Sequence, residues 1–350
     1  EIGSGLVGSE MCIRDSNKAG KGHTDLTLYK YAGEPLNRAR LERTREFLLN
    51  HGLRMDDDAD YLVCLYDEDG RMMATGSLCA NVLKYIAVAD EAQGEGACAT
   101  VVSELVSQAY RQGLKKLFLF TKPSNEAMFK SLGFYPIATT ADTMMMENSR
   151  NGLDLYLASL PRADGTAGAI VANCNPLTNG HLYLMEQASM RVDVLHIFVL
   201  SEDRSLYSAH ARYDLVKRGA QHIKNAYIHH SGDYLISSAT FPAYFIKEGA
   251  DARQINADLD IALFGARIAP PLNIKYRFVG TEPYCPVTSA YNERMKQLLP
   301  QYGIEVVELQ RLDGISASQV RALASQGRWD QVAGMVPKVT LDYLMGYGNK

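Results

Sequence analysis

Predicted strands and helices alternate through the second half of this 350-residue chain, and this alternation constrains its fold more than any other feature. Short apolar runs, typical of strands, are each followed by a segment with apolar residues at helical spacing. The predicted strands are Gly168–Cys174, Asp193–Leu200, Tyr227–His230, Ile274–Gly280 and Glu305–Leu309. Helices are predicted from His181, over Ala209–Ile223, Ile255–Phe264 and Ser289–Leu299, and from Ser316 onward. The alternation predicts an α/β domain with a parallel, Rossmann-like sheet covered on both faces.

The first half shows a different order of elements, typical of a mixed α/β domain. A helix is predicted near Asn37–His51, before strands at Tyr61–Tyr66, Met72–Leu78 and Val82–Val88. The glycine-containing loop Gln93–Cys98 then precedes a second helix, a strand at Lys116–Thr121 and a short helix at Asn125–Leu132 that Gly133 ends. We therefore expect one domain over residues 25–162 and another over 163–350, after a disordered or artefactual tail over residues 1–24.

Composition excludes several classes of function. A net charge of −4 offers no field that would attract DNA or RNA, so no nucleic-acid partner is expected. Even the apolar run Val192–Leu200 is too short to span a bilayer and is interrupted by Asp193 and His196, so we expect no membrane association. The six cysteines form no C-x-x-C pair, which argues against a zinc site or a disulfide framework and favours the reducing cytoplasm.

One segment of the second half predicts a nucleotide site. The run Asn173-Cys174-Asn175-Pro176-Leu177-Thr178-Asn179-Gly180-His181 follows a predicted strand and begins a predicted helix. Backbone N–H groups at a helix N-terminus, with an imidazole beside them, form a favourable site for phosphate. The segment resembles a nucleotidyltransferase signature, and this resemblance implies ATP contacts from Asn173, Asn175, Thr178, Gly180 and His181.

A second segment, Ile315–Arg321, supplies hydroxyls and a guanidinium at the start of another predicted helix. Ser316 and Ser318 either cap that helix or donate to phosphate oxygens, and Arg321 lies near its first turn. Attack of an oxygen nucleophile on the α-phosphate of ATP needs positioning and charge neutralisation more than covalent help. We therefore predict His181 and Arg321 as the catalytic pair, with Ser316, Ser318 and Arg321 as further ATP contacts.

Two charged loop residues complete the candidates in the second half. Arg204 follows the second predicted strand and is a candidate triphosphate or substrate contact, although a solvated charged loop explains it equally well. Glu282 follows the strand Ile274–Gly280 and is a weaker candidate for holding Mg²⁺ through water. The metal ligands themselves stay unassigned.

Both halves carry motifs of known families. The run ending in Thr178-Asn179-Gly180-His181 resembles the [HT]-x-G-H signature of nucleotidyltransferases, and Ile315–Arg321 resembles the second signature of that superfamily. Gln93–Cys98, with Leu132-Gly133-Phe134 downstream, resembles the GNAT acetyltransferases, although Cys98 stands where glycine or alanine is usual. This second resemblance implies contacts to a pantetheine or CoA-like arm from Gln93, Gly94, Gly96 and Asn125, because glycines let the backbone approach a diphosphate closely. A glycine turn that merely joins a strand to a helix is the alternative.

Taken together, the two halves resemble the citrate (pro-3S)-lyase ligase family. The resemblance also includes Ser201–Leu206, His230–Tyr234, Ala239–Pro242 and Glu282–Thr288. It implies that ATP and Mg²⁺ activate acetate as acetyl-adenylate with release of diphosphate. The acetyl group would then pass to the thiol of a CoA-derived prosthetic group on the acyl carrier (gamma) subunit of citrate lyase, releasing AMP. The residue that takes the thiol proton stays open among Tyr183, Tyr207, Tyr284 and His230.

Three other functions remain open from the sequence. An adenylyltransferase of the phosphopantetheine or nicotinamide mononucleotide type would share both signatures but has no N-terminal half of this kind. A GNAT N-acetyltransferase with a nucleotide-sensing second domain would turn over acetyl-CoA without ATP. A non-enzymatic assembly factor would bind citrate lyase without releasing AMP.

Overall fold

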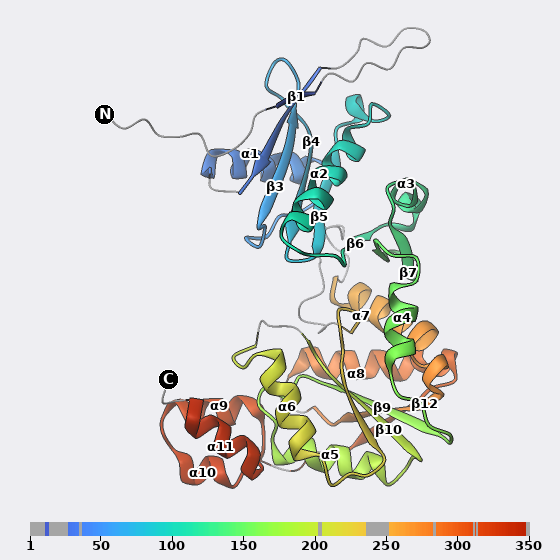
Figure 1. The fold of residues 1–350 in the computed structure, drawn as a ribbon, viewed down its shortest axis with the longest axis vertical. Coiled ribbons are helices and arrows are strands. Elements are labelled where there is room, and N and C mark those ends of the chain that lie inside the picture. The colour runs from blue at the N-terminus through green and yellow to red at the C-terminus, as the bar shows by residue number, and fades with distance from the viewer. Residues whose placement is uncertain are drawn as a thin grey trace. The chain divides into compact units, whose positions relative to one another are not determined.

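The computed structural model describes residues 11–13, 27–34, 37–201, 205–235, 252–282, 285–310, 312 and 314–347. They form two compact units that divide between Arg150 and Asn151 (Figure 1). Helix α4 (Gly152–Ser159) therefore belongs to the second unit, whereas the sequence suggested a boundary near residue 163. The Tyr156 hydroxyl anchors α4 there by donating to the carbonyl oxygen of His230 at 2.7 Å.

The first unit contains an eight-stranded sheet in the order β1-β2-β3-β4-β5-β6-β8-β7. Its strands are antiparallel except for the parallel pair β5–β6. Their bounds are β1 Met11–Ile13, β2 Leu28–Gly33, β3 Tyr61–Tyr66, β4 Met72–Cys79, β5 Val82–Val88, β6 Phe118–Thr121, β7 Tyr135–Thr139 and β8 Met144–Glu147. Strand β1 falls within the segment expected to be a tail, and the rest of residues 1–24 lies outside the described residues.

Three helices accompany this sheet, namely α1 (Arg38–Asn50), α2 (Ala97–Arg111) and α3 (Glu126–Ser131). Helix α2 buries Val101, Val102, Leu105 and Ala109 in the main core, as their helical spacing predicted. This order of strand, glycine loop and helix agrees with the mixed α/β domain expected for the first half.

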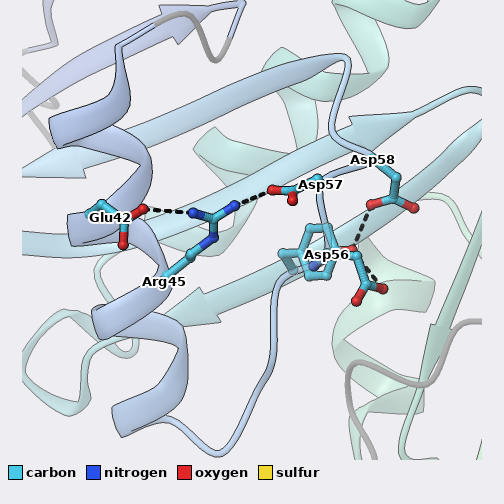
Figure 2. A network of polar contacts seen from close by, with 6 residues as sticks. Glu42, Arg45, Asp56, Asp57 and Asp58 are labelled. Atoms are coloured by element: carbon cyan, nitrogen blue, oxygen red, sulfur yellow. Dashed lines mark hydrogen bonds and ion pairs between the residues drawn. The ribbon is translucent and has the colours of Figure 1, made fainter.

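The connection between α1 and β3 is held by a polar network (Figure 2). Arg45 of α1 donates to Glu42 at 2.7 Å and also pairs with Asp57 of the connection. The Asp58 carboxylate of the same connection accepts a 2.7 Å hydrogen bond from the Tyr85 hydroxyl. Asp58 also pairs with Lys84, which is buried. The network thus attaches this segment both to a helix and to strand β5.

The second unit contains a five-stranded parallel sheet in the order β11-β10-β9-β12-β13, which confirms the predicted Rossmann-like architecture. Its strands are β9 Ala167–Ala172, β10 Val194–Val199, β11 Ala226–His230, β12 Ile274–Gly280 and β13 Glu305–Leu309. Chain order reverses between the neighbours β9 and β12, so this pair forms the topological switch point where such sheets bind ligands.

Helices cover both faces of this sheet (Figure 1). Their bounds are α5 Asn179–Ser189, α6 Ala209–Gly219, α7 Ala252–Leu263, α8 Pro286–Leu298, α9 Ala317–Ser325, α10 Trp329–Ala333 and α11 Lys338–Tyr347. One face packs Leu195, Ile197 and Val199 against buried residues of α5 and α6. Helix α5 begins at Asn179, two residues before the predicted first residue His181, so that prediction is wrong: the Thr178 side chain caps the helix. Across the described part of the chain, no helix has both the length and the apolar character needed to cross a bilayer.

Two buried histidines on neighbouring strands of the second unit predict a pH-dependent stability. Nδ1 of His196 lies 2.9 Å from Nε2 of His229, and burial lowers the pKa of His196 to about 4 and that of His229 to about 3. The unfolded chain, with an ordinary histidine pKa near ~6.5, binds protons first, so stability is complete above that pH and falls as the pH drops toward 4 and 3. We expect a loss of about 2 kcal/mol per histidine at pH 5.

Urea unfolding at pH 7.5 and 5.0 would check this expectation, because fluorescence of the single tryptophan, Trp329, reports on the second unit. Replacing both histidines by leucine should flatten the pH dependence. Replacing the exposed His210 by leucine should leave it unchanged. An equally steep profile in the double variant would contradict the assignment.

Candidate active site

A cavity of about 360 Å³ opens at the carboxyl ends of β9 and β12, at the switch point of the parallel sheet. The predicted residues that line it are Asn173, Thr178, Gly180, His181 and Ser316, and Glu282 lines it as well. They come from the end of β9, the start of α5, the loop after β12 and the start of α9. The two sequence segments thus contribute to one cavity, although more than 130 residues separate Gly180 from Ser316.

Thr178 and His181 form a reciprocal capping box at the start of α5. The His181 N–H donates to Thr178 Oγ1 at 3.3 Å, and the Thr178 N–H donates to His181 Nδ1 at 3.1 Å. Because Nδ1 accepts this hydrogen bond, the proton of a neutral His181 ring lies on Nε2. The cap therefore selects the tautomer that offers an N–H donor at the lining of the cavity.

Direct contacts join the two sequence segments. A Cβ on Gly180 would lie 3.7 Å from the carbonyl oxygen of Ile315, so the start of α5 closely approaches the loop before α9. Arg321 of α9 donates from Nη1 to the carbonyl oxygen of Asn175. In the described part of the chain the cavity lining includes neither Asn175, Ser318 nor Arg321. The structure therefore places Arg321 as a link between the segments, beside the cavity.

A buried arginine holds Asn173 in place. The side chain of Arg212 on α6 is fully buried, and its Nη1 donates to Asn173 Oδ1 at 2.6 Å and to the Asn173 carbonyl oxygen at 3.0 Å. Nη1 also donates to the carbonyl oxygen of Leu200 at 2.7 Å, and Nε donates to the carbonyl oxygen of Tyr207 at 3.0 Å. Ser205 adds a hydrogen bond with the Asn173 side chain. Arg212 thereby joins the ends of β9 and β10 and positions Asn173.

Sequence reasoning did not assign this role to Arg212, although a signal was present. Arg212 precedes the buried residues Leu215 and Val216 at helical spacing, so it lies on the apolar face of α6. Arginine on such a face is rarely fully buried unless it is paired.

Some predicted site residues lie outside the described residues, namely Arg204, Tyr284 and the segment Ala239–Pro242. Glu282 accepts a hydrogen bond from the Cys285 N–H at 3.2 Å. Within the ranges the structure describes, no three histidine, cysteine or acidic side chains gather as a metal cluster.

The inner part of the same cavity holds a polar group that the sequence analysis missed. Asp260 of α7 accepts a hydrogen bond from the Tyr291 hydroxyl of α8, and burial raises the pKa of Asp260 to about 6. Arg277 of β12 lies nearby, and burial lowers its pKa. Strands of a covered parallel sheet are mostly buried, so a charged residue inside β12 was the available signal, but Lys275 of the same strand is exposed and the sequence alone does not separate the two.

A second cavity, of about 610 Å³, lies within the first unit, where the GNAT resemblance predicted an arm-binding site. It is lined by Gln93, Gly94, Gly96 and Asn125, together with Cys98 at the start of α2. Gly94 and Gly96 have φ values of +87° and +76°, a left-handed conformation that favours glycine. The N-terminus of the 15-residue helix α2 thus borders the cavity.

Side-chain contacts at this cavity are local. Gln93 donates to Asp90 at 2.7 Å, and Asn125 donates to Thr121 at 2.9 Å. Burial raises the pKa of Cys98 to about 11, so at neutral pH it is a thiol and a poor nucleophile.

The described candidates for the thiol base lie elsewhere in the second unit. Tyr207 is buried and meets Tyr343 edge to face, and His230 stacks on Tyr213 with ring centroids 3.7 Å apart. Neither they nor Tyr183 belong to the lining of the 360 Å³ cavity among the residues that the structure places.

The fold and the two cavities define a two-domain α/β protein that joins an acetyltransferase-like unit to a nucleotidyltransferase-like unit. Family models agree: the citrate lyase ligase C-terminal domain matches residues 167–344, and the acetyltransferase (GNAT) family matches residues 27–134. The citrate (pro-3S)-lyase ligase of Klebsiella pneumoniae is 43% identical over 321 residues, which cover 88% of this chain and 94% of the relative. The corresponding ligase of Escherichia coli K12 is 37% identical, covering 87% of this chain and 90% of its own length. The chain therefore belongs to the citrate (pro-3S)-lyase ligase family, a family of enzymes, as its motifs predicted.

Solved structures resemble parts of the chain. They include Escherichia coli ElaA, with a TM-score of 0.32, 12% identity and coverage of 35% of this chain and 99% of that protein. Thermotoga maritima TmcAL bound with alpha-thio ATP has a TM-score of 0.38 and 13% identity, covering 53% of this chain and 56% of that protein.

Proposed function

We propose that this protein uses ATP and acetate to acetylate the thiol of the CoA-derived prosthetic group on the acyl carrier (gamma) subunit of citrate lyase. The observation that carries the proposal is the convergence of Asn173–His181 and Ile315–Ala317 on one cavity at the switch point of a parallel sheet. Membership of the citrate lyase ligase family supports the choice of substrates.

The proposed reaction has two steps. An acetate oxygen attacks the α-phosphorus of ATP, and the bond to diphosphate breaks, giving acetyl-adenylate. The His181 Nε2–H and the backbone N–H groups at the start of α5 stabilise the charge that develops on the phosphoryl oxygens. The carrier thiol, after losing its proton, then attacks the acetyl carbon, and AMP leaves.

Other proposed contacts follow from the geometry. Thr178, Gly180 and Ser316 would border the phosphates, and Arg321 would hold the Asn175 turn that carries them. Mg²⁺, when bound, neutralises phosphate charge, and the Glu282 carboxylate at the cavity lining is an oxygen donor of the kind that Mg²⁺ prefers. The described cysteines Cys64, Cys79, Cys98, Cys174 and Cys285 are free thiols, which suits the reducing cytoplasm where we place the reaction.

The test is to incubate the protein with ATP, Mg²⁺, acetate and deacetylated citrate lyase, and to follow AMP and lyase activity together. We expect one AMP for each reactivated carrier. Diphosphate release with a phosphate acceptor and no acetate would favour an adenylyltransferase. Acetyl-CoA turnover without ATP would favour an N-acetyltransferase, and binding without AMP would favour an assembly factor.

We further propose that the 610 Å³ cavity of the first unit holds the carrier's CoA-derived arm, with contacts from Gln93, Gly94, Gly96 and Asn125. Gly96→Leu should then impair loading of the carrier and spare acetate-dependent ATP–diphosphate exchange, because only the second step uses this cavity. Gly113→Leu is the matched control, since Gly113 has a similar φ of +81° at the other end of α2 and does not belong to the described lining. If Gly96→Leu, but not Gly113→Leu, lost carrier loading and ATP–diphosphate exchange equally, the proposal that only the second step uses this cavity would be contradicted.

A further inference from the structure

Arg277 at the inner part of the 360 Å³ cavity is a buried cation with an unused donor. It is 5% exposed, and its Nη1 has no hydrogen-bond partner among the residues that the structure describes. The guanidinium carbon lies 4.8 Å from the centroid of the Phe264 ring, which offers a π-face and no acceptor oxygen. Leaving a buried donor unsatisfied is unfavourable, so an acceptor on a ligand bound in the cavity would stabilise this arginine.

The neighbouring carboxylate does not supply that acceptor. Asp260 accepts a hydrogen bond from the Tyr291 hydroxyl, and within the described ranges Arg277 forms no ion pair. Desolvation raises the pKa of Tyr291 well above its ordinary value, so its hydroxyl keeps its proton and remains the donor. Asp260 and Tyr291 thus hydrogen-bond each other, and Arg277, which interacts with Asp260 electrostatically, keeps Nη1 without an acceptor from the described residues at the cavity lining.

The surroundings specify the kind of ligand. A planar guanidinium matches the two oxygens of a carboxylate, and Nη1 of Arg277 still lacks an acceptor in the described part of the chain although Asp260 interacts with Arg277 electrostatically. Phe264, Met295 and Leu299 also line the cavity and offer an apolar wall suited to a short alkyl group. The lining residues at helix starts, Thr178 and Ser316, lie at the carboxyl edge of the sheet, whereas Arg277 lies within β12. Phosphate therefore fits the edge, and a small organic acid fits the interior.

We propose that Arg277 binds the carboxylate of the short-chain acid that is activated in this cavity, with Phe264 and Met295 contacting its alkyl group. The inference rests on the proposed function, because it assumes that the same cavity holds ATP. It places the acid on the inner side of the nucleotide, between the apolar wall and the phosphates.

The test measures acetate-dependent ATP–diphosphate exchange for Arg277→Met and determines the two KM values separately. We expect the KM for acetate to rise about 10- to 100-fold, the range for one hydrogen bond to a charged group, while the KM for ATP stays within about twofold. Arg277→Lys keeps the positive charge but lacks the planar pair of N–H donors, so its KM for acetate should lie between the values of wild type and Arg277→Met. Lys275→Met, which removes an exposed cation from the same strand, is the matched control and should behave as wild type.

The outcomes separate the inference from the proposed function. An unchanged KM for acetate in folded Arg277→Met, with folding checked by Trp329 fluorescence, would overturn the inference. An equal rise in the KM for ATP would also overturn it, in favour of a phosphate contact. If wild type shows no exchange, the proposed function fails, and calorimetric titration with acetate then tests whether Arg277 binds the acid. Binding of acetate by wild type and Lys275→Met but not by Arg277→Met would support the inference. Absence of acetate binding to wild type contradicts it.

Discussion

Replacing His181 by alanine is expected to lower acetate-dependent ATP–diphosphate exchange about 100- to 1,000-fold, the usual cost of losing one preorganised donor. The capping box orients the imidazole so that Nδ1 accepts the Thr178 N–H, and the proposed mechanism uses the proton on Nε2 as the donor to a phosphoryl oxygen. The donor is already oriented before ATP binds, so its loss acts mainly on the transition state. The measurement is kcat for exchange at saturating ATP and acetate.

The size of the effect distinguishes catalysis from stability. Loss of the cap itself costs about 1 kcal/mol of helix stability, which leaves the protein folded. Urea unfolding followed through Trp329 would confirm this for His181→Ala. The control His222→Ala removes an exposed imidazole that pairs with Glu186 outside the described cavity lining, and it should keep full activity. Exchange within about threefold of wild type in His181→Ala would contradict the proposed role, because one lost donor costs far more.

Arg212→Met is expected to produce the largest loss of stability, about 3 to 5 kcal/mol in the free energy of unfolding of the second unit. Methionine fills similar space but donates no hydrogen bond. The carbonyl oxygens of Asn173, Leu200 and Tyr207 would each lose a charged donor. Each buried acceptor left without a partner costs about 1–3 kcal/mol.

The matched control for this variant lies on the same helix. Arg218 is exposed and forms a surface ion pair with Asp214 at 3.4 Å. Arg218→Met should therefore change the free energy of unfolding by less than about 0.5 kcal/mol. Urea titration with Trp329 fluorescence measures both variants. Similar stability of the two variants would show that the buried hydrogen bonds of Arg212 contribute little.

The sequence was most informative where the pattern is local. The strand, the turn and the helix at Asn173–His181 are adjacent in the chain, and Thr178 caps its own helix, so their order could be inferred without tertiary contacts. The same holds for β12 and β13, whose predicted bounds match the structure. The predicted start of α5 was wrong by two residues, because helical periodicity shows that a helix is present more reliably than it shows where the helix begins.

Strands without a clear alternating pattern were missed. β8 reads Met-Met-Met-Glu, and all four residues are buried, so neither composition nor alternation distinguishes it from a helix or a loop. β2 and β7 were likewise not predicted. Their pairing partners β3 and β8 establish them as strands, and pairing is a property of the folded sheet.

By itself, the sequence determined the two architectures, the family and the two segments that line the 360 Å³ cavity, because each of these depends on residues close together in the chain. Only the tertiary structure revealed that Arg212 holds Asn173 across 39 positions. It alone also brings Arg277, Asp260 and Tyr291 together from a strand and two helices. The physical reason is that a charged side chain can be buried only where partners satisfy its hydrogen bonds. Those partners come from distant parts of the chain, so the local sequence pattern does not identify them.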